Sequence, residues 1–353
     1  MTGQEPDAKI QVMIASPLEP EYVARIAAAY PDRVDVLYHP DLLPPPRYAA
    51  DHTGDPAWRR APARQAAWRA LLARAEVLWD FPVGEDAPLL ALAPRLRWLQ
   101  TTSAGVGARA ARLGLHGTDV IVTTASGVHA GPLAEFVFAV LLAHAKRFPH
   151  LAALQRARRW ERFCGGELRG QTLAIIGPGR VGREVARLGR AFGMTVWATA
   201  RDNDPARAAA LGVDRLFPRH DLGALLGGAD AVVLSLPHTP ETDGLLGPAE
   251  IAALKPGAVL INIARGAVLA EAALAAVRAG RLGLAALDVA GAEPLPADSP
   301  LWGLPNVLIC PHSASTAASE NARLTDRFLA NLGAYLVGAY SRMEPILDKA
   351  RLY

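Results

Sequence analysis

The sequence predicts an α/β protein of two domains, and three observations support this prediction. The chain has 353 residues, which is more than a single hydrophobic core usually serves. Its composition is 51% hydrophobic and 20% charged, as expected of a folded rather than a disordered protein. Short apolar runs alternate with stretches rich in Ala, Leu and Arg, the pattern of βαβ units around a parallel sheet.

A first series of apolar runs predicts the strands of one sheet, at residues 9–16, 33–39, 75–81, 96–102 and 119–126. Between the second and third runs, residues 40–66 are rich in Pro, Gly and Asp, so we expect an irregular excursion whose role the sequence does not assign. The apolar stretch 132–148 predicts a buried helix. It carries Glu135, and its uninterrupted apolar core is too short to span a bilayer.

A second series of runs predicts another sheet, at residues 172–179, 194–200, 230–237, 258–264, 282–289 and 306–312. These runs are uniformly apolar, as strands covered by helices on both faces must be. The helical stretch 315–339 can return the chain to the first domain. We therefore predict one domain from residues 1–125 and 313–353 and a second from residues 126–312.

Charge and cysteine usage exclude several classes of protein. The net charge is only +3, and the Arg residues occur without a nucleic-acid-binding motif, so we expect neither nucleic acid nor a membrane as a partner. Cys164 and Cys310 alone cannot build a disulfide framework or a zinc cluster, which favours the cytoplasm and no metal. The opening "MTGQEPDAKI" is polar, unlike a leader peptide. The charge run at 156–163 predicts a solvated helical face, with Trp160 at a dimer interface as the alternative.

A glycine-rich turn follows the first strand of the second series. Gly177, Gly179 and Gly182 form a G-x-G-x-x-G pattern between a strand and a helix, which predicts a Rossmann-type, doubly wound dinucleotide-binding sheet. Gly177 allows the tight turn, Gly179 the approach of a pyrophosphate, and Gly182 close packing of the helix.

The end of the next strand bears on the choice of cofactor. An acidic residue that holds the adenosine ribose is expected there, but Ala200 occupies the position and Arg201 follows. An Arg suits a 2′-phosphate, so NADP(H) is favoured. Asp202 lies close enough to offer a carboxylate instead, which keeps NAD(H) possible.

Three polar residues follow successive strands of the second series: Arg265, Glu293 and His312. The carboxyl ends of parallel strands face the ligand crevice, so we expect these residues to meet at the cofactor. Arg265 can hold a carboxylate and polarise a carbonyl, and His312 can supply a proton near neutral pH. Glu293 can orient the imidazole if it binds the other ring nitrogen. Together they predict reduction of a 2-keto acid by hydride transfer.

At these residues the sequence resembles the D-isomer-specific 2-hydroxyacid dehydrogenase family, which includes glyoxylate/hydroxypyruvate reductases and phosphoglycerate dehydrogenases. The resemblance runs from about residue 95 to near the chain end, and its motifs are "ELRGQTLAIIGPGRVGREVARLGRAFGM", "SLPHTPETDGLLG", "LKPGAVLINIARGAVL", "AALDVAGAEPLP" and "SPLWGLPNVLICPH". It implies a flavodoxin-like substrate domain built from both chain ends, a Rossmann cofactor domain, and a homodimer formed largely through the cofactor domains.

The resemblance also implies roles for individual residues. Arg265 binds substrate, Glu293 supports the histidine, and His312 is the acid/base. In "TSAGVG", the amides of Ala104, Gly105 and Val106 bind the substrate carboxylate. Beyond the glycine turn and Arg201, the implied cofactor contacts are Arg180, Val181, Pro237, Thr242, Ile263, Ala264, Asp288 and Ser315.

The favoured function is thus an NAD(P)-dependent oxidoreductase acting on a small 2-keto or D-2-hydroxy acid, in the direction of glyoxylate- or hydroxypyruvate-like reduction. The alternative is a dimeric protein that senses NAD(H), like corepressors of similar fold, without turnover. Formate dehydrogenase is disfavoured, because Glu293 stands where that enzyme has Gln.

Overall fold

In the computed structural model of this protein, residues 9–200, 204–270 and 272–351 are described. The chain divides into two compact units. Unit 1 comprises Met1–Val128 and Thr316–Tyr353, and unit 2 comprises His129–Ser315. The boundaries expected from the sequence lie three residues away at each division, at 125 against 128 and at 312 against 315.

Unit 1 is built on a five-stranded parallel sheet in the order β2-β1-β3-β4-β5, the flavodoxin-type order. Each strand falls within one of the predicted apolar runs. The strands are β1 (Ile10–Ile14), β2 (Val34–Leu37), β3 (Val77–Trp79), β4 (Trp98–Gln100) and β5 (Ile121–Thr123). The helices are α1 (Pro20–Ala29), α2 (Pro62–Arg74), α3 (Leu89–Leu92), α4 (Gly107–Arg112) and α12 (Glu320–Leu336), with short 3-10 turns η1 (Pro40–Leu42) and η5 (Tyr340–Arg342).

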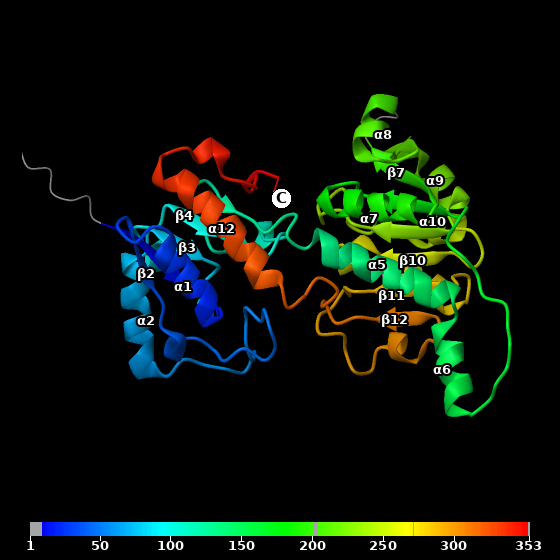
Figure 1. The fold of residues 1–353 in the computed structure, drawn as a ribbon, viewed down its shortest axis with the longest axis horizontal. Coiled ribbons are helices and arrows are strands. Elements are labelled where there is room, and N and C mark those ends of the chain that lie inside the picture. Colours follow the sequence, from blue (N-terminus) through cyan, green and yellow to red (C-terminus); the bar gives the residue numbers. More distant parts are fainter. Residues whose placement is uncertain (1–8, 201–203, 271, 352–353) are drawn as a thin grey trace, which may run out of the picture. The chain divides into compact units, whose positions relative to one another are not determined.

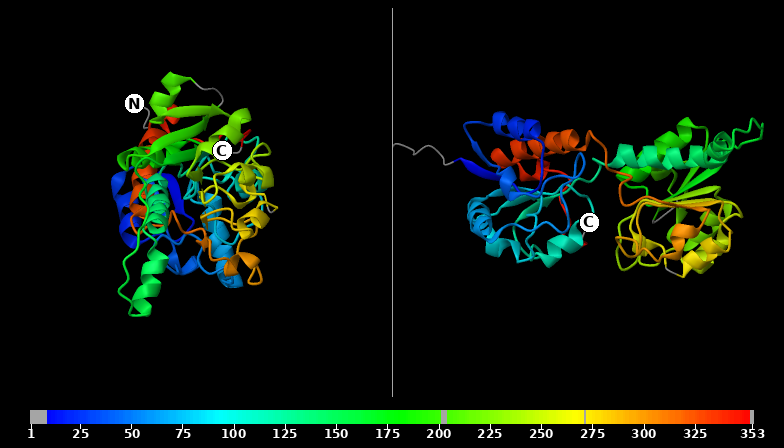
Figure 2. Two further views of the ribbon diagram at one scale, coloured as in Figure 1. Left: turned by 90° about the vertical axis from the view of Figure 1, so that its right-hand side faces the viewer. Right: turned by 90° about the horizontal axis from the view of Figure 1, so that it is seen from below.

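The two faces of the unit 1 sheet carry separate hydrophobic cores, because side chains alternate along each strand. Helices α1 and α12 cover one face and α2 the other (Figure 2, right). On the α12 face, the Phe328 ring stacks on Trp98 with centroids 5.0 Å apart and meets the edge of Trp79 at 5.3 Å. The end of the chain thereby completes the core of the unit in which the chain begins, as the sequence predicts.

Unit 2 is built on a seven-stranded parallel sheet in the order β12-β11-β10-β9-β6-β7-β8 (Figure 1). Numbered from β6, this is the doubly wound order 3-2-1-4-5-6 with one further strand. The strands are β6 (Thr172–Ile176), β7 (Thr195–Ala200), β8 (Arg215–Pro218), β9 (Ala231–Leu234), β10 (Val259–Asn262), β11 (Leu284–Leu287) and β12 (Val307–Ile309). Strand β8 was not predicted, because its "RLFP" is short and begins with an exposed Arg.

Helices pack on both faces of the unit 2 sheet and give it two cores. They are α5 (Ala130–Ala145), α6 (Phe148–Arg156), α7 (Arg180–Ala191), α8 (Pro205–Leu211), α9 (Leu222–Gly228), α10 (Pro248–Ala253) and α11 (Ala273–Arg278), with 3-10 turns η2 (Arg219–Asp221), η3 (Gly266–Val268) and η4 (Pro300–Gly303). The predicted buried helix is α5, whose inner side chains belong to the core. Both parallel sheets confirm the predicted two-domain α/β fold.

One helix is shorter than predicted. Helix α6 ends at Arg156, and residues 159–167 continue without regular secondary structure, so the prediction of a helical face over 156–163 is wrong. The segment is exposed, and Trp160 is fully so.

Within the described residues, no single helix has the length and hydropathy of a membrane span. Helices α5 and α6 reach that length and composition only as a pair, with a 58° bend between them.

Candidate active site

The carboxyl ends of all strands of unit 2 lie along one edge of its sheet, because the strands are parallel. Strands β6 and β9 are neighbours there, although β7 and β8 separate them in sequence. This is the topological switch point of the sheet, where open α/β sheets bind their ligands. The residues predicted for cofactor and catalysis in unit 2 follow strands along this edge.

The glycine turn joins β6 to α7 and has the features that a dinucleotide requires. Gly177 has a φ of +96°, and a Cβ there would lie 2.6 Å from Cβ of Leu236. A Cβ on Gly182 would lie 2.6 Å from the Gly177 carbonyl oxygen, so this glycine permits α7 to pack against the turn. Gly179 caps α7 and faces open space, which leaves room for a pyrophosphate beside the first turn of the helix.

Two hydroxyl side chains that the sequence did not single out hold this turn. Ser235 Oγ donates to the Gly177 carbonyl at 2.8 Å, and the Gly177 amide donates to Thr199 Oγ1 at 3.2 Å. They come from β7 and from the segment after β9. Arg180 begins α7, and Val181 packs against the core. These contacts make the turn a rigid feature of the sheet edge.

The residues that bear on cofactor choice follow β7 in the sequence. Strand β7 ends at Ala200, while Arg201 and Asp202 lie outside the described residues. The preference for NADP(H) over NAD(H) therefore remains a prediction from the sequence.

Arg265 is delivered to the edge by β10 and a turn built on Asn262. This Asn is fully buried. Its Oδ1 accepts the Ala264 amide at 3.0 Å, and its Nδ2 donates to the Arg265 carbonyl at 3.2 Å. Gly266 follows where a Cβ would lie 1.9 Å from the Ala290 oxygen, so only glycine fits. The signal for Asn262 was available in the sequence, as the one amide within the otherwise apolar run 258–264.

The guanidinium of Arg265 is partly buried, and its Nη1 donates to the Ala264 carbonyl at 2.6 Å. Burial lowers the pKa of Arg265, and the carboxylates of Glu293 and Asp288 act in the opposite direction. An Arg pKa begins so high that the side chain stays charged at neutral pH. The edge therefore carries a permanent cation close to two carboxylates.

His312 and Glu293 form a pair, as predicted. His312 Nδ1 lies 2.8 Å from Glu293 Oε2, and the other Glu293 oxygen accepts the Ala290 amide at 3.0 Å. Their side chains are 47% and 40% exposed, so the pair is open to a ligand. With Nδ1 engaged, the nitrogen of His312 that remains for a substrate is Nε2.

The backbone of His312 is held in an unusual conformation. Its φ is +53°, a region that non-glycine residues enter at a cost of about 1–3 kcal/mol. The His312 amide donates to the Asp288 carbonyl at 2.8 Å, and Asp288 Oδ1 accepts the amides of Ser313 and Ala314, both at 2.9 Å. Asp288 is 3% exposed. Through these hydrogen bonds this buried residue holds the loop that carries His312.

Asp288 also acts on the neighbouring thiol. Burial and the Asp288 carboxylate raise the pKa of Cys310 to about 11. The family resemblance implies a cofactor contact for Asp288; in the structure its carboxylate accepts amides of the loop that follows His312.

The other predicted residues are placed as follows. The Pro237 carbonyl accepts Thr242 Oγ1 at 2.8 Å, after β9. Ile263 and Ala264 are buried after β10, and Ser315 is the last residue of unit 2. Ala104 and Gly105 are exposed in unit 1, and Val106 is buried at the start of α4, with its amide 3.2 Å from the Ala104 oxygen. Within the described part of the chain, no three His, Cys, Asp or Glu side chains gather as a metal site.

Comparison with known proteins identifies the family. The model of the NAD binding domain of D-isomer specific 2-hydroxyacid dehydrogenases matches residues 138–314, within unit 2. The glyoxylate reductase of Aeropyrum pernix is 36% identical over 267 residues, which are 72% of this chain and 77% of that protein. The chain belongs to the D-isomer specific 2-hydroxyacid dehydrogenase family. The predicted resemblance is thereby confirmed.

Two further relatives extend the comparison of this family member. The D-3-phosphoglycerate dehydrogenase of Mycobacterium bovis is 40% identical over 250 residues, 68% of this chain, and the match covers 45% of that protein. The chain therefore spans about half the length of this relative. The NADPH-dependent glyoxylate/hydroxypyruvate reductase of Sinorhizobium meliloti, solved with NADP and sulfate, has a TM-score of 0.75 at 27% identity. That comparison covers 98% of this chain and 100% of the other.

Proposed function

We propose that this dehydrogenase-family member reduces a small 2-keto acid to the corresponding 2-hydroxy acid, with glyoxylate and hydroxypyruvate as the first substrates to test. The observation that carries the proposal is the 2.8 Å contact between His312 Nδ1 and Glu293 at the edge where β10 delivers Arg265. A general acid, the residue that orients it and a fixed cation are what reduction of a carbonyl next to a carboxylate requires.

Each of the three residues has a defined part in this reaction. Arg265 binds the substrate carboxylate through its planar fork and stabilises the negative charge that develops on the carbonyl oxygen. His312 holds a proton on Nε2 and passes it to that oxygen. Glu293 binds Nδ1 and sets the direction of the ring. A nicotinamide cofactor, when bound, supplies the hydride.

We propose NADP(H) as the preferred cofactor, bound at the glycine turn, with NAD(H) as the weaker one. The turn has the open approach at Gly179 and the close packing at Gly182 that a pyrophosphate site needs. Arg201 follows β7 in sequence, where an Arg suits a 2′-phosphate. The related S. meliloti reductase is described as NADPH-dependent.

We further propose that the amides of Ala104, Gly105 and Val106 contribute to binding the substrate carboxylate.

We also propose that the chain acts as a homodimer through unit 2. Large apolar side chains on and after α6 are exposed and are suited to an interface: Phe148 (55%), Leu151 (43%) and Trp160 (100%). Size-exclusion chromatography with light scattering tests the dimer, and Trp160→Asp should shift it toward monomer.

The test of the activity is cofactor oxidation with NADPH beside NADH, against glyoxylate, hydroxypyruvate, pyruvate and phenylpyruvate. Turnover with an NADPH preference supports the whole proposal. Turnover that favours NADH keeps the reaction and removes the role of Arg201. Cofactor binding without turnover of any of the four acids would contradict the proposal and favour a sensing protein.

A further inference from the structure

Unit 1 contains a cavity of about 230 Å³ that none of the proposed roles uses. Its walls come from the irregular stretch between β2 and α2, from the segment after β3, and from α4. The side chains that matter for its chemistry are His52, Trp58, Arg59, Asp80, Phe81 and Arg109. The volume is below that of a whole ligand site, so it fits one end of a small molecule.

The most informative side chain in the wall is Arg109 on α4. Its guanidinium carbon lies 4.6 Å from the centre of the Phe81 ring, which holds the group in place by a cation–π contact. In the described part of the chain, Arg109 has neither a hydrogen-bond acceptor nor a carboxylate partner. Five N–H donors of a partly buried cation are therefore available to a ligand.

The neighbouring cations Arg59 and Arg60 have different partners, and of the two only Arg59 lines the cavity. The Arg60 side chain is 2% exposed, ion-pairs with Glu85 at 3.9 Å and donates to two backbone carbonyls, so it supports the loop. Arg59 lines the cavity, and its Nη1 donates only to the carbonyls of Pro56 and Trp58. No carboxylate within the described residues neutralises Arg59, which leaves it free to assist Arg109.

His52 also lines the cavity and lies beside a carboxylate. Its Nε2 lies 3.5 Å from Glu320 Oε1, and its side chain is 11% exposed. Burial works against its charge most strongly, but Glu320, Asp80 and Glu19 outweigh burial and raise the pKa of His52 above its ordinary value.

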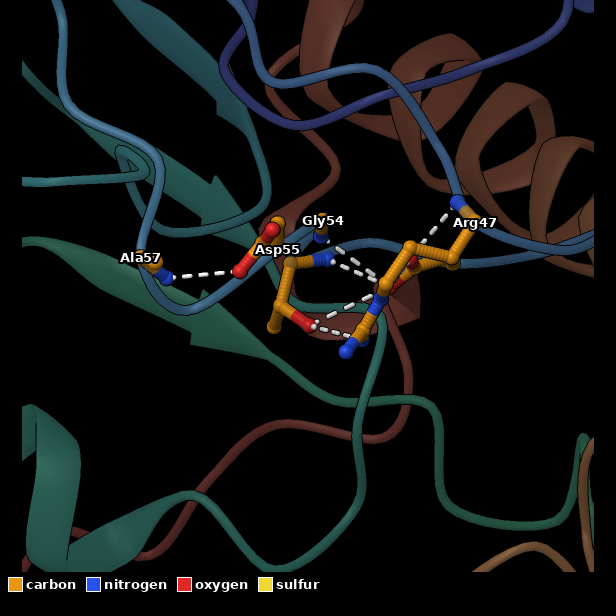
Figure 3. A network of polar contacts seen from close by, with 6 residues as sticks. Arg47, Gly54, Asp55 and Ala57 are labelled. Atoms are coloured by element: carbon orange, nitrogen blue, oxygen red, sulfur yellow. Dashed lines mark hydrogen bonds and ion pairs between the residues drawn. The ribbon is translucent and has the colours of Figure 1, made fainter.

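The two carboxylates in the wall are occupied by local donors. Asp80 accepts Thr102 Oγ1 at 2.7 Å and the Phe81 amide at 2.8 Å, and it is 6% exposed. Asp55 Oδ1 accepts the Ala57 amide at 2.7 Å (Figure 3). The formal charges of the wall nearly cancel, and its unused hydrogen-bond donors lie on the cations.

The loop that carries His52 is fastened by a buried carboxylate. Asp51 is 2% exposed and accepts six hydrogen bonds, from the side chain and amide of Arg47, from Thr53 and from the Gly54 amide (Figure 3). Gly54 has a φ of +67°, and a Cβ there would lie 2.4 Å from Cβ of Pro44. The wall is thus a preorganised structure, as a binding site requires.

We propose that this cavity binds a second anionic group, a carboxylate or a phosphate, at the far end of the 2-keto acid, with Arg109 as the main donor and Arg59 assisting. Arginine is the side chain whose fork matches both anions. Glyoxylate and hydroxypyruvate are then truncated forms of the preferred substrates.

This inference rests on the proposed function, because it needs the substrate carboxylate at the loop 104–106. That loop and the cavity share one edge of the unit 1 sheet. Strands β3 and β4 are paired, and the Asp80 amide donates to the Gln100 carbonyl at 2.7 Å. Arg109 lies one helical turn after Val106. One molecule with an anion at each end can therefore span the loop and the cavity.

Two matched pairs of 2-keto acids test the proposal on the full chain: 2-oxoglutarate beside 2-oxohexanoate, and 3-phosphohydroxypyruvate beside hydroxypyruvate. Calorimetry measures Kd for each acid, and cofactor oxidation measures kcat/KM. We expect the acid with the second anion to be favoured by about 10- to 100-fold. The carboxylate pair and the phosphate pair show which anion the cavity takes.

Arg109→Met keeps the stem over Phe81 and should bring both ratios toward one, mainly through KM. Arg59→Met should lower them less. Arg112→Met is the matched control, exposed on the same helix and outside the cavity wall, and should leave them unchanged. Thermal melting checks that each variant is folded.

The outcomes separate the two proposals. Turnover of glyoxylate with no preference for the second anion, or a preference that survives in Arg109→Met, overturns the cavity and keeps the activity. Arg109-dependent binding of 2-oxoglutarate without turnover of any acid keeps the cavity and overturns the activity. If no acid is turned over and no acid with a second anion binds through Arg109, both proposals are overturned.

Discussion

In unit 2 the key side chains follow strand ends closely, whereas in unit 1 much of the cavity wall is the irregular stretch between β2 and α2. Strand β10 ends at Asn262 and β12 ends at Ile309, so Arg265 and His312 each lie three residues after a strand. The wall of the unit 1 cavity depends instead on Asp51, which collects donors from Arg47, Thr53 and Gly54. The hydrogen bonds of the sheet position a residue that follows a strand. An irregular loop needs hydrogen bonds from its own side chains, here those of Asp51.

Substitutions at these two places should act differently. Side chains at the unit 2 edge stand on a preformed scaffold, so their loss should change the rate and leave stability nearly intact. The anchor residues of the unit 1 loop are buried in their own network, so their loss should change stability first. The five predictions below test this division, from the largest expected effect to the smallest.

Replacing the proposed acid should have the largest effect. We expect His312→Gln to lower kcat by roughly 10²–10⁴-fold, because proton transfer to the carbonyl oxygen is lost. Steady-state kinetics measures the rate, and NADPH fluorescence titration should show unchanged cofactor binding. His220→Gln removes an exposed histidine of the same unit and serves as the control. A normal rate in His312→Gln would remove this residue from the mechanism.

Removing the fixed cation comes next. Arg265→Ala should lower kcat/KM by about 10²–10³-fold, since the substrate carboxylate and the developing oxyanion lose their charged donor. Arg265→Lys should recover only part of this, because an ammonium cannot bind as a planar fork. Arg278→Ala, exposed in the same unit, is the control for loss of charge. Rates in Arg265→Ala within a few-fold of the parent would contradict the role.

In unit 1, Asp51→Asn should destabilise the fold by about 1–3 kcal/mol at pH 7, because a buried acceptor of charged and amide donors is lost. Burial alone would raise the pKa of Asp51, but hydrogen bonds from Arg47, Gly54 and Thr53 lower it well below its usual range. A lowered folded-state pKa stabilises the fold above the unfolded value of about 4, and this contribution is lost as the pH falls below it.

Urea unfolding of parent and Asp51→Asn at pH 7, 5 and 3 measures this contribution. The difference between the two proteins should be largest at pH 7 and shrink toward pH 3. A difference that grows on acidification would show that the Asp51 carboxylate does not anchor the loop.

The glycine of the same loop sharpens the comparison further. Gly54→Ala should cost more stability than Gly117→Ala, although both glycines have a φ near +70°. A Cβ at Gly54 meets Pro44 at 2.4 Å, while nothing lies within 4 Å of one at Gly117. An Ala in the left-handed region costs about 1 kcal/mol at either position. The difference between the two melting temperatures therefore reports the clash with Pro44 alone. Equal costs would mean that the loop yields at Gly54.

The smallest effect concerns the thiols. Burial and Asp288 raise the pKa of Cys310 to about 11, so at pH 8 almost none of it is thiolate. Iodoacetamide followed by mass spectrometry should modify the exposed Cys164 first and leave Cys310 largely unmodified. Rapid modification of Cys310 would show that the Asp288 loop opens often, and would weaken the contrast between a rigid edge in unit 2 and a self-anchored loop in unit 1.

Much of the fold was predictable because its signals are local. Eleven apolar runs coincide with strands, and the G-x-G-x-x-G spacing lies at the turn after β6, as a strand, turn and helix together require. The pairing of Glu293 with His312, and the position of Arg265 at the same sheet edge, agree with one rule, that parallel strands end at one edge. Strand β8 and the end of α6 at Arg156 were not predicted, since a short strand that begins with an exposed Arg and a charged helix end carry no clear periodic signal.

By itself, the sequence determined the family and the two parallel sheets, and it placed the residues of the proposed chemistry after the strands of unit 2. Only the tertiary structure decided which partners those residues have. Asn262 shapes the turn at Arg265, Asp288 fastens the loop of His312, and Phe81 holds Arg109 over the unit 1 cavity. The physical reason is that backbone amides and aromatic faces acquire a direction only when the chain has folded, so spacing in the sequence cannot reveal which side chain they meet.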